Sequence, residues 1–298
     1  MKKLFLCVAT VLLLLSGCSN VEKNIDFKVE FLNVGHADAA LISCNGHHML
    51  IDCGENPYKI QNILLDEGRS ISALDYIIFT HSDNDHVGGF DGVLDVVKNE
   101  DKYNIGKIYV NQETESILKQ KLIETKIPYS IPKTNQTIKL AKAEIKFLSV
   151  DDVPTSNTNN HSIIVMISCG NNKATRVLMM GDAEYDLEEH LLDQHKKGKI
   201  DLTCDVLKVA HHGSNTSTQK EFLEIAKPTY AIISVGNKYG LPSNEVITNL
   251  KSKDITYYTT IDNGNITVSG ADKEISVVPD HDWDLYSTNS PYYIENEE

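Results

Sequence analysis

The segment Thr80-His81-Ser82-Asp83-Asn84-Asp85-His86-Val87-Gly88-Gly89 is the most informative part of this 298-residue sequence. It follows Tyr76-Ile-Ile-Phe-Thr80, a continuous apolar run typical of a buried strand, and it leads into a helix predicted over 88–97. Four side chains that can bind a metal fall within six residues, namely His81, Asp83, Asp85 and His86. In a turn closed by glycines they can serve two ions about 3.5–4 Å apart. A polar loop with one N-capping Asp would not require this set.

Two later segments place the same kinds of residue directly after predicted strands. Leu178-Met-Met-Gly-Asp182 ends in a carboxylate, and Leu207-Lys-Val-Ala-His211-His212-Gly213-Ser214 carries two imidazoles. Because α/β folds collect ligands where strands end, we expect both segments near the first one. A Gly-Asp pair alone indicates only a turn, whereas two histidines after a buried strand are more specific for a site.

The rest of the sequence alternates predicted strands and helices, without a repeat or an internal linker. Strands are predicted over 27–32, 39–43, 49–52, 144–150, 161–168, 176–180, 206–210 and 230–234, with one or two more after Val268. Helices are predicted over 57–67, 114–125 and 243–252, from a cap at Asp182 to 195, and from a Thr218/Glu221 capping box to 226. We therefore expect one continuous α/β domain of about 250 residues.

The N-terminal segment is typical of an exported lipoprotein. Lys2 and Lys3 precede the apolar run Leu4 to Leu15, which is too short to span a bilayer and has the length of a signal-peptide core. The following Leu15-Ser16-Gly17-Cys18 resembles the lipobox of bacterial lipoproteins; a plain secretory signal is the alternative. The predicted organisation is a signal peptide over 1–17, a tether over 18–26 with lipidated Cys18, a domain over 27–279 and an acidic tail over 280–298. We expect the protein at the cell membrane, outside the cytoplasm, held by the lipid alone.

Composition and cysteine usage exclude several classes of protein. The sequence has 28 Lys+Arg and 42 Asp+Glu, for a net charge of −14, with 41% hydrophobic residues as in ordinary globular proteins. A stable nucleic-acid coat is not expected, because duplex binding requires clustered cations. The cysteines of the predicted domain have no C-x-x-C spacing, which favours free buried thiols over disulfides or a cysteine zinc site; they are Cys44, Cys53, Cys169 and Cys204.

Together the motifs resemble the metallo-β-lactamase fold superfamily, and most closely the C-terminal domain of the ComEC family of competence DNA-uptake channel proteins. The resemblance extends from about Phe27 to Val278. It rests on motifs in the family's order: Phe31-Leu-Asn-Val-Gly-His-Ala-Asp38, Leu50-Ile-Asp-Cys-Gly54, His81-Ser-Asp-Asn-Asp-His86, Gly181-Asp182, His211-His-Gly-Ser-Asn-Thr-Ser217 and Asn237-Lys-Tyr-Gly-Leu-Pro-Ser243. It implies a single α/β domain, an αββα sandwich of two sheets between helices, with two divalent metal ions at the sheet edges.

The resemblance also implies the metal ligands: His81 and Asp83 for one ion, Asp85 and His86 for the other, Asp182 between both, and His211 at the second ion. The superfamily's usual H-x-H-x-D-H motif has a histidine where Asp83 stands. A carboxylate there makes Mn²⁺ or Mg²⁺ more competitive with Zn²⁺. His161 is either a further ligand or a strand-end histidine that faces solvent.

Several neighbouring residues have two interpretations. His212 is either a general acid near the leaving group or a supporting residue, and Asp52 either orients a ligand histidine or is a turn carboxylate. The sequence departs from the ComEC pattern at His36, which stands in place of Gln, and at Leu241, which stands in place of His. His36 either takes a polar role or is an incidental surface residue. Neither position holds a metal ligand, so the departures leave the metal site intact and the substrate open.

These features predict a metal-dependent hydrolase with a dinuclear site, in which Asp85 and His212 are the catalytic candidates. The expected substrate is a phosphodiester or another small anionic molecule, including extracellular single-stranded DNA. Residues 214–217 precede a predicted helix N-terminus that can bind phosphate, although they also fit helix capping alone. The alternatives are hydrolysis of a small ester, lactone or β-lactam, and a non-catalytic surface lipoprotein that holds metal structurally.

Overall fold

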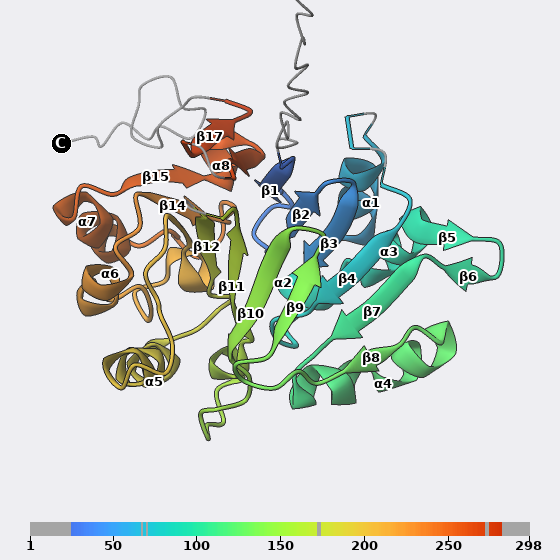
Figure 1. Ribbon diagram of the computed structural model, residues 1–298, viewed down its shortest axis with the longest axis horizontal. Coiled ribbons are helices and arrows are strands. Elements are labelled where there is room, and N and C mark those ends of the chain that lie inside the picture. The colour runs from blue at the N-terminus through green and yellow to red at the C-terminus, as the bar shows by residue number, and fades with distance from the viewer. Residues whose placement is uncertain (1–24, 67, 70, 172–173, 272–273, 282–298) are drawn as a thin grey trace, which may run out of the picture.

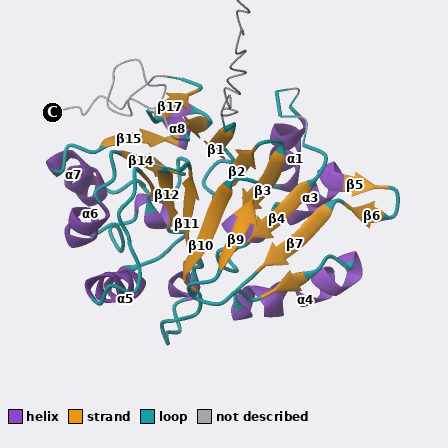
Figure 2. Cartoon of the chain, viewed as in Figure 1, coloured by secondary structure: helices purple, strands orange, loops and turns teal. Residues whose placement is uncertain are grey.

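Two β-sheets packed face to face form the centre of the molecule, and helices cover their outer faces (Figure 1, Figure 2). The computed structural model describes residues 25–281, except 67, 70, 172–173 and 272–273. The expected αββα sandwich is therefore confirmed. Among the described residues, no helix has the length and apolar character needed to cross a membrane.

The first sheet has eight strands in the order β17 (Ser276–Pro279), β16 (Ile266–Ser269), β1 (Phe27–Phe31), β2 (Ala40–Cys44), β3 (His47–Ile51), β4 (Leu74–Ile78), β7 (Ile105–Tyr109) and β8 (Tyr129–Ser130). Strands from β17 to β3 pair antiparallel, and strands from β3 to β8 pair parallel. A small hairpin of β5 (Lys98–Asn99) and β6 (Lys102–Tyr103) extends beside this sheet.

The second sheet has seven strands in the order β15 (Thr256–Thr259), β14 (Tyr230–Ile233), β13 (Val206–Lys208), β12 (Thr175–Met179), β11 (Ile164–Cys169), β10 (Ala143–Ser149) and β9 (Thr137–Leu140). Strands β12 to β15 pair parallel, so their C-terminal ends meet at one edge. The inner faces of both sheets share one apolar core, in which Val29, Phe31, Phe147 and Val177 are fully buried.

Helices on each side bury apolar faces against their own sheet. On the first sheet lie α1 (Pro57–Leu65), α3 (Phe90–Val97) and α4 (Gln112–Thr125). On the second sheet lie α5 (Tyr185–Lys196), α6 (Lys220–Ala226) and α7 (Asn244–Ser252). The short helices are α2 (Asn84–Val87), α8 (Thr260–Asn263), η1 (Thr158–His161) and η2 (Ala210–Gly213). Burial at helical spacing, such as Leu187 and Leu191 in α5, explains why these segments fold as helices.

Two predicted helix starts are wrong. Asp182 does not cap the fifth helix, which begins at Tyr185 after Glu184. Thr218 does not form a capping box, because its φ is +56° and α6 begins after Gln219. The predicted cap at Ser243 is confirmed, since its side chain accepts from the Val246 N–H. The strand predicted from His161 begins at Ile164, because residues 158–161 form a 3₁₀ turn.

The described chain also bears on the predicted domain boundaries and on the state of the cysteines. Ile25 packs against the central core, so the domain begins before residue 27. At the other end, the Asp280 carboxylate accepts from the Asn265 backbone N–H, which extends the domain past residue 279. All four cysteines of the described residues are buried thiols outside any disulfide, as expected. The predicted signal peptide and Cys18, and nearly all of the predicted tail, lie outside the described residues.

Candidate metal centre

The loops that follow β4, β12 and β13 meet at one edge of the sandwich and carry the candidate ligands. The His211 N–H donates to the Gly181 carbonyl at 3.1 Å, so the loops after β12 and β13 are joined directly. Gly181 has a φ of +52°, and a Cβ there would lie within 3.1 Å of both Ser162 and Thr80. Glycine therefore suits this position, because a side chain would be strained by the positive φ and would crowd Ser162 and Thr80.

Four side chains converge into one group that can hold a metal ion: Asp85, His86, Asp182 and His212. One ligand atom from each lies within 4.8 Å of the others. The His86 Nε2 lies 3.2 Å from the Asp182 Oδ1, and the His212 Nε2 lies 3.1 Å from the Asp85 Oδ2. The distance from the His212 Nε2 to the Asp182 Oδ2 is 3.5 Å. Two carboxylates and two imidazoles at this spacing suit a divalent ion.

His81 and Asp83 stand beside this group, where the sequence placed the other ion. The His81 ring is fully buried, 4.0 Å from the His86 ring between centroids, and its Nε2 lies 3.8 Å from the Asp83 Oδ2. Asp83 occupies the N-cap of α2 but makes no side-chain capping hydrogen bond within the described chain. Its carboxylate forms a hydrogen bond with the Thr158 side chain, and beside His81 it is a candidate ligand for a second ion.

The donor atoms themselves indicate that this cluster is built for cations. Three buried atoms of the cluster are among those that make no hydrogen bond within the described residues: His81 Nε2, His86 Nε2 and Asp182 Oδ1, of which the last two face each other at 3.2 Å. Buried polar atoms are rarely left in this state, and a bound divalent ion would partner them. Four carboxylates face the cluster without a lysine or arginine partner in the described chain, namely Asp52, Asp83, Asp85 and Asp182. Two divalent ions carry the charge that would balance them, so the residues present fit a dinuclear site.

The pKa values in the cluster shift in both directions. Burial lowers the pKa of His86 and of His212, but Asp182 and the other nearby carboxylates outweigh it and raise both pKa values above the usual range, so bound cations would have to displace these protons. Two other groups are already in the form that binds a metal. Burial, assisted by the nearby His86, lowers the pKa of His81 to about 3, so this imidazole is neutral at pH 7. Burial raises the pKa of Asp85, but the hydrogen bond with His212 and the charges of His86 and His212 together outweigh it and bring this pKa to about 2. A neutral imidazole and an ionised carboxylate are the forms that bind metals.

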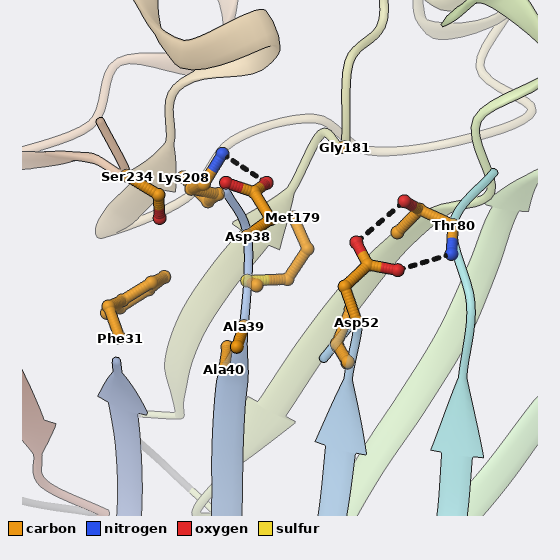
Figure 3. Close-up of a pocket in the computed structure, with 11 residues that line it drawn as sticks. Phe31, Asp38, Ala39, Ala40, Asp52, Thr80, Met179, Gly181, Lys208 and Ser234 are labelled. Atoms are coloured by element: carbon orange, nitrogen blue, oxygen red, sulfur yellow. Dashed lines mark hydrogen bonds and ion pairs between the residues drawn. The ribbon is translucent and has the colours of Figure 1, made fainter. Parts of the chain in front are cut away.

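Asp52 fixes the orientation of His86. Its carboxylate accepts from the Thr80 backbone N–H at 2.8 Å and from the Thr80 hydroxyl at 2.7 Å, as Figure 3 shows. The same carboxylate lies 2.8 Å from the His86 Nδ1. With Nδ1 held in this way, the Nε2 of His86 points to Asp182. The structure therefore supports the interpretation of Asp52 as a residue that orients a ligand histidine.

The structure places His212, rather than His211, within the four-residue group. The His212 Nδ1–H donates to the Ser234 carbonyl at 2.7 Å, which turns its Nε2 toward Asp85 and Asp182. His211 lies at the rim: its Nδ1 is 3.1 Å from the Thr216 hydroxyl, and its Nε2 is 4.0 Å from the Asp182 Oδ2. Both histidines have positive φ values, 46° and 52°, so the sharp turn sends adjacent side chains to different places.

His161 contacts a different set of partners. Its Nε2 lies 3.1 Å from the Thr155 carbonyl, and its Nδ1 lies 3.6 Å from Glu113 and 3.7 Å from Asp151. In this structure it faces a polar hollow between α4 and the 151–161 loop, and its role as a metal ligand stays a prediction.

The start of α6 does not fit phosphate binding, because the N–H groups of residues 218 and 219 donate to the buried Glu188 carboxylate.

Sequence reasoning missed a buried ion pair beneath the cluster. The Lys208 Nζ lies 2.6 Å from the Asp38 Oδ2, and both side chains are less than 10% exposed (Figure 3). Asp38 follows β1 in the first sheet, whereas Lys208 ends β13 in the second, so the pair joins the two sheets. They line a cavity of about 10 Å³, which is too small for a substrate. A lysine inside the apolar run Val206-Leu-Lys-Val-Ala210 was the available signal.

Comparisons with known proteins agree with this arrangement. The family model described as "Metallo-beta-lactamase superfamily" matches residues 32–237. ComE operon protein 3 of Bacillus subtilis is 26% identical over 95% of this chain and 38% of its own length. Recombination protein 2 of Haemophilus influenzae is 30% identical over 82% of this chain and 29% of its own length. The chain thus spans well under half the length of these relatives. A ribonuclease Z of Clostridium kluyveri is 32% identical over 38% of this chain and 39% of its own length.

Solved structures share the fold. The metallo-beta-lactamase fold protein YhfI of Bacillus subtilis matches with a TM-score of 0.56 and 14% identity, covering 81% of this chain and 98% of that protein. A diphosphatase from the PhnP family matches with a TM-score of 0.52 and 15% identity, covering 80% of this chain and 97% of that protein. At this identity the likeness concerns the fold alone.

Proposed function

We propose that the protein cleaves phosphodiester bonds with the help of two divalent metal ions. The chain belongs to the metallo-beta-lactamase superfamily and is a hydrolase of that superfamily. The observation that carries the proposal is the group of Asp85, His86, Asp182 and His212, with His81 beside it and buried donor atoms that make no hydrogen bond within the described residues. Two-metal sites of this kind serve nucleases and phosphatases. The relative named ribonuclease Z supports the choice of a phosphodiester.

The proposed division of labour follows the contacts of each side chain. Two bound ions would lower the pKa of a water molecule and stabilise the charge that develops on a phosphoryl oxygen. Asp52 keeps His86 in one orientation, and the Ser234 carbonyl does the same for His212. Asp83 in the first set gives that position a carboxylate, which favours Mn²⁺ or Mg²⁺ relative to an imidazole.

His211 is the proton donor in this proposal. Its Nδ1 lies 3.2 Å from the Glu184 carboxylate and beside the Thr216 hydroxyl, so these groups fix the ring and its Nε2 is directed toward the cluster. The His211 side chain is 26% exposed, which leaves Nε2 accessible to a leaving group. A histidine held in this way can give a proton to the departing oxygen.

A metal-reconstitution screen tests the proposal. The chain without its signal segment would be stripped of metal and reloaded with Mn²⁺ or Zn²⁺. It would then be assayed with bis-p-nitrophenyl phosphate, single-stranded DNA and nitrocefin. We expect about two metal ions per chain by elemental analysis and turnover of the phosphodiesters. Turnover of nitrocefin or simple esters alone would instead support the ester and β-lactam alternative, and two bound ions without any turnover would support a binding lipoprotein.

We further propose that the protein is exported and anchored outside the cytoplasm through a lipid on Cys18. The support is the sequence alone: the apolar run ends in Leu15-Ser16-Gly17-Cys18. Cys18→Ser should leave the domain folded but release it from the membrane fraction or leave it unprocessed, because the thiol serves only lipid attachment. Membrane retention equal to that of the unmodified chain in cell fractionation would contradict this proposal.

A further inference from the structure

Three aromatic rings form a row from the metal cluster to the surface. The His36 ring lies 4.7 Å from the His212 ring, and the Tyr239 ring lies 5.1 Å from the His36 ring, both between centroids. The two distances together set an upper limit of 9.8 Å between the rings of His212 and Tyr239. His36 is 9% exposed, so it is not the incidental surface residue that the sequence allowed. Tyr239 is therefore the outer end of a row that begins at a metal-ligand position.

Backbone contacts hold the inner part of this row in place. A Cβ on Gly236 would lie 2.6 Å from the His36 backbone nitrogen, so only glycine permits the approach of the two loops. The Gly236 N–H donates to the His36 Nδ1 at 3.3 Å. On the outer side, the Lys238 Nζ pairs with Glu55 at 3.1 Å and ties the Tyr239 loop to the loop after β3.

Tyr239 nevertheless leaves most of its ring open to solvent. Its side chain is 83% exposed, and its contact with His36 is edge-to-face, with 65° between the ring planes. Its φ of +60° is uncommon for a residue other than glycine. A cation lies beside the residue that precedes His36, because the Lys59 Nζ is 3.7 Å from the point where a Cβ on Gly35 would stand. Burial lowers the pKa of Lys59, and no carboxylate of the described residues counteracts this shift.

We propose that Tyr239, His36 and Lys59 form a subsite for the nucleoside next to the scissile phosphate, with the nucleobase stacked on Tyr239. This inference rests on the proposed phosphodiesterase function and narrows its substrate to nucleotides. An open aromatic face stacks on any base, so the subsite selects nucleic acid without selecting sequence. The rings of His212 and Tyr239 are at most 9.8 Å apart, so a base on Tyr239 can belong to a nucleotide whose phosphate lies at the metal cluster. Lys59 provides a positive charge in a chain whose net charge is −14.

Two substrates with the same leaving group test the subsite. Thymidine 5′-(p-nitrophenyl phosphate) carries a base, whereas methyl p-nitrophenyl phosphate does not. Tyr239→Ala should raise the KM for the thymidine substrate at least about fivefold, since stacking on an aromatic side chain is worth about 1–3 kcal/mol per base. It should leave the KM for the methyl substrate unchanged, and Tyr239→Phe should behave as the unmodified chain. Ile123→Ala, which removes another exposed apolar side chain on α4, serves as the control.

A binding measurement separates this inference from the proposed function. Saturation-transfer NMR with adenosine 5′-monophosphate and deoxyribose 5-phosphate reports on base contact without turnover. We expect transfer to the adenine protons, its loss in Tyr239→Ala and its retention in Tyr239→Phe. Equal KM changes for both substrates, or adenine transfer unaffected by Tyr239→Ala, would overturn the subsite. If the unmodified chain hydrolyses neither substrate, the proposed function fails, and adenine binding at Tyr239 is still decided by the NMR result.

Discussion

Replacing Lys208 tests whether the ion pair beneath the metal cluster holds the two sheets together. Lys208 is 2% exposed and Asp38 is 7% exposed, with 2.6 Å between their charged atoms. In Lys208→Met the Asp38 carboxylate would stay buried without its partner. Breaking a buried pair in this way costs about 3–5 kcal/mol. For a domain of this size, that loss lowers the melting temperature by roughly 10 °C.

Urea unfolding in the presence of a chelator measures this effect, because the chelator removes the contribution of metal binding. The matched control is Lys196→Met, which breaks a pair of similar length, 3.0 Å to Glu221, between side chains that are 59% and 63% exposed. We expect the control to lose less than about 1 kcal/mol. The double variant Lys208→Met/Asp38→Leu should recover most of the loss, since both charges are gone. A loss in Lys208→Met no larger than in the control would refute the reasoning.

Three further predictions concern the ligands and one buried acid. Asp182→Ala should abolish turnover and remove more than one metal ion per chain, because the proposed site uses Asp182 as a ligand of both ions; retention of two ions by elemental analysis would exclude a shared ligand. Asp83→His should lower Mn²⁺-supported turnover more than Zn²⁺-supported turnover, and an unchanged activity ratio would remove Asp83 from the ligand set. Burial raises the pKa of Glu188 from 4.5 to about 7, so the folded chain keeps this proton to a higher pH than the unfolded chain. The free energy of unfolding therefore decreases by about 3 kcal/mol as the pH rises from 4.5 to about 7. Glu188→Gln should remove that fall from urea-unfolding curves, and parallel pH profiles for both chains would contradict it.

The ligand motif of residues 81–86 was predictable because its information is local. His81, Asp83, Asp85 and His86 lie in one short turn between a buried strand and a helix, so spacing alone brought them together. The two histidines after β13 were harder, because the side chains of a left-handed turn diverge by backbone angles that residue type does not reveal. The choice between His211 and His212 depends on the Ser234 carbonyl, which belongs to another strand.

The difference between local sequence information and contacts from distant elements also explains the missed strands and the wrong helix caps. The segment Thr218 to Glu221 has the composition of a capping box, but Glu188 from α5 takes the N–H groups that the box would have bonded. Strands β7, β9 and β15 were not predicted, since their segments are short and interrupted by polar residues or glycine. Sheet neighbours, rather than intrinsic preference, make them strands.

The pairing of β1 with β16 has a consequence for how the protein is made. Residues 27–31 of the central layer hydrogen-bond with residues 266–269, near the far end of the described chain. A strand pair so distant in sequence forms only after nearly the whole chain is available, and it carries a large loop-closure entropy. The edge of β1 therefore stays open until the last strands emerge from the ribosome. Under the proposed export, this delay keeps the chain unfolded long enough to be threaded through a membrane, and the sandwich closes on the far side.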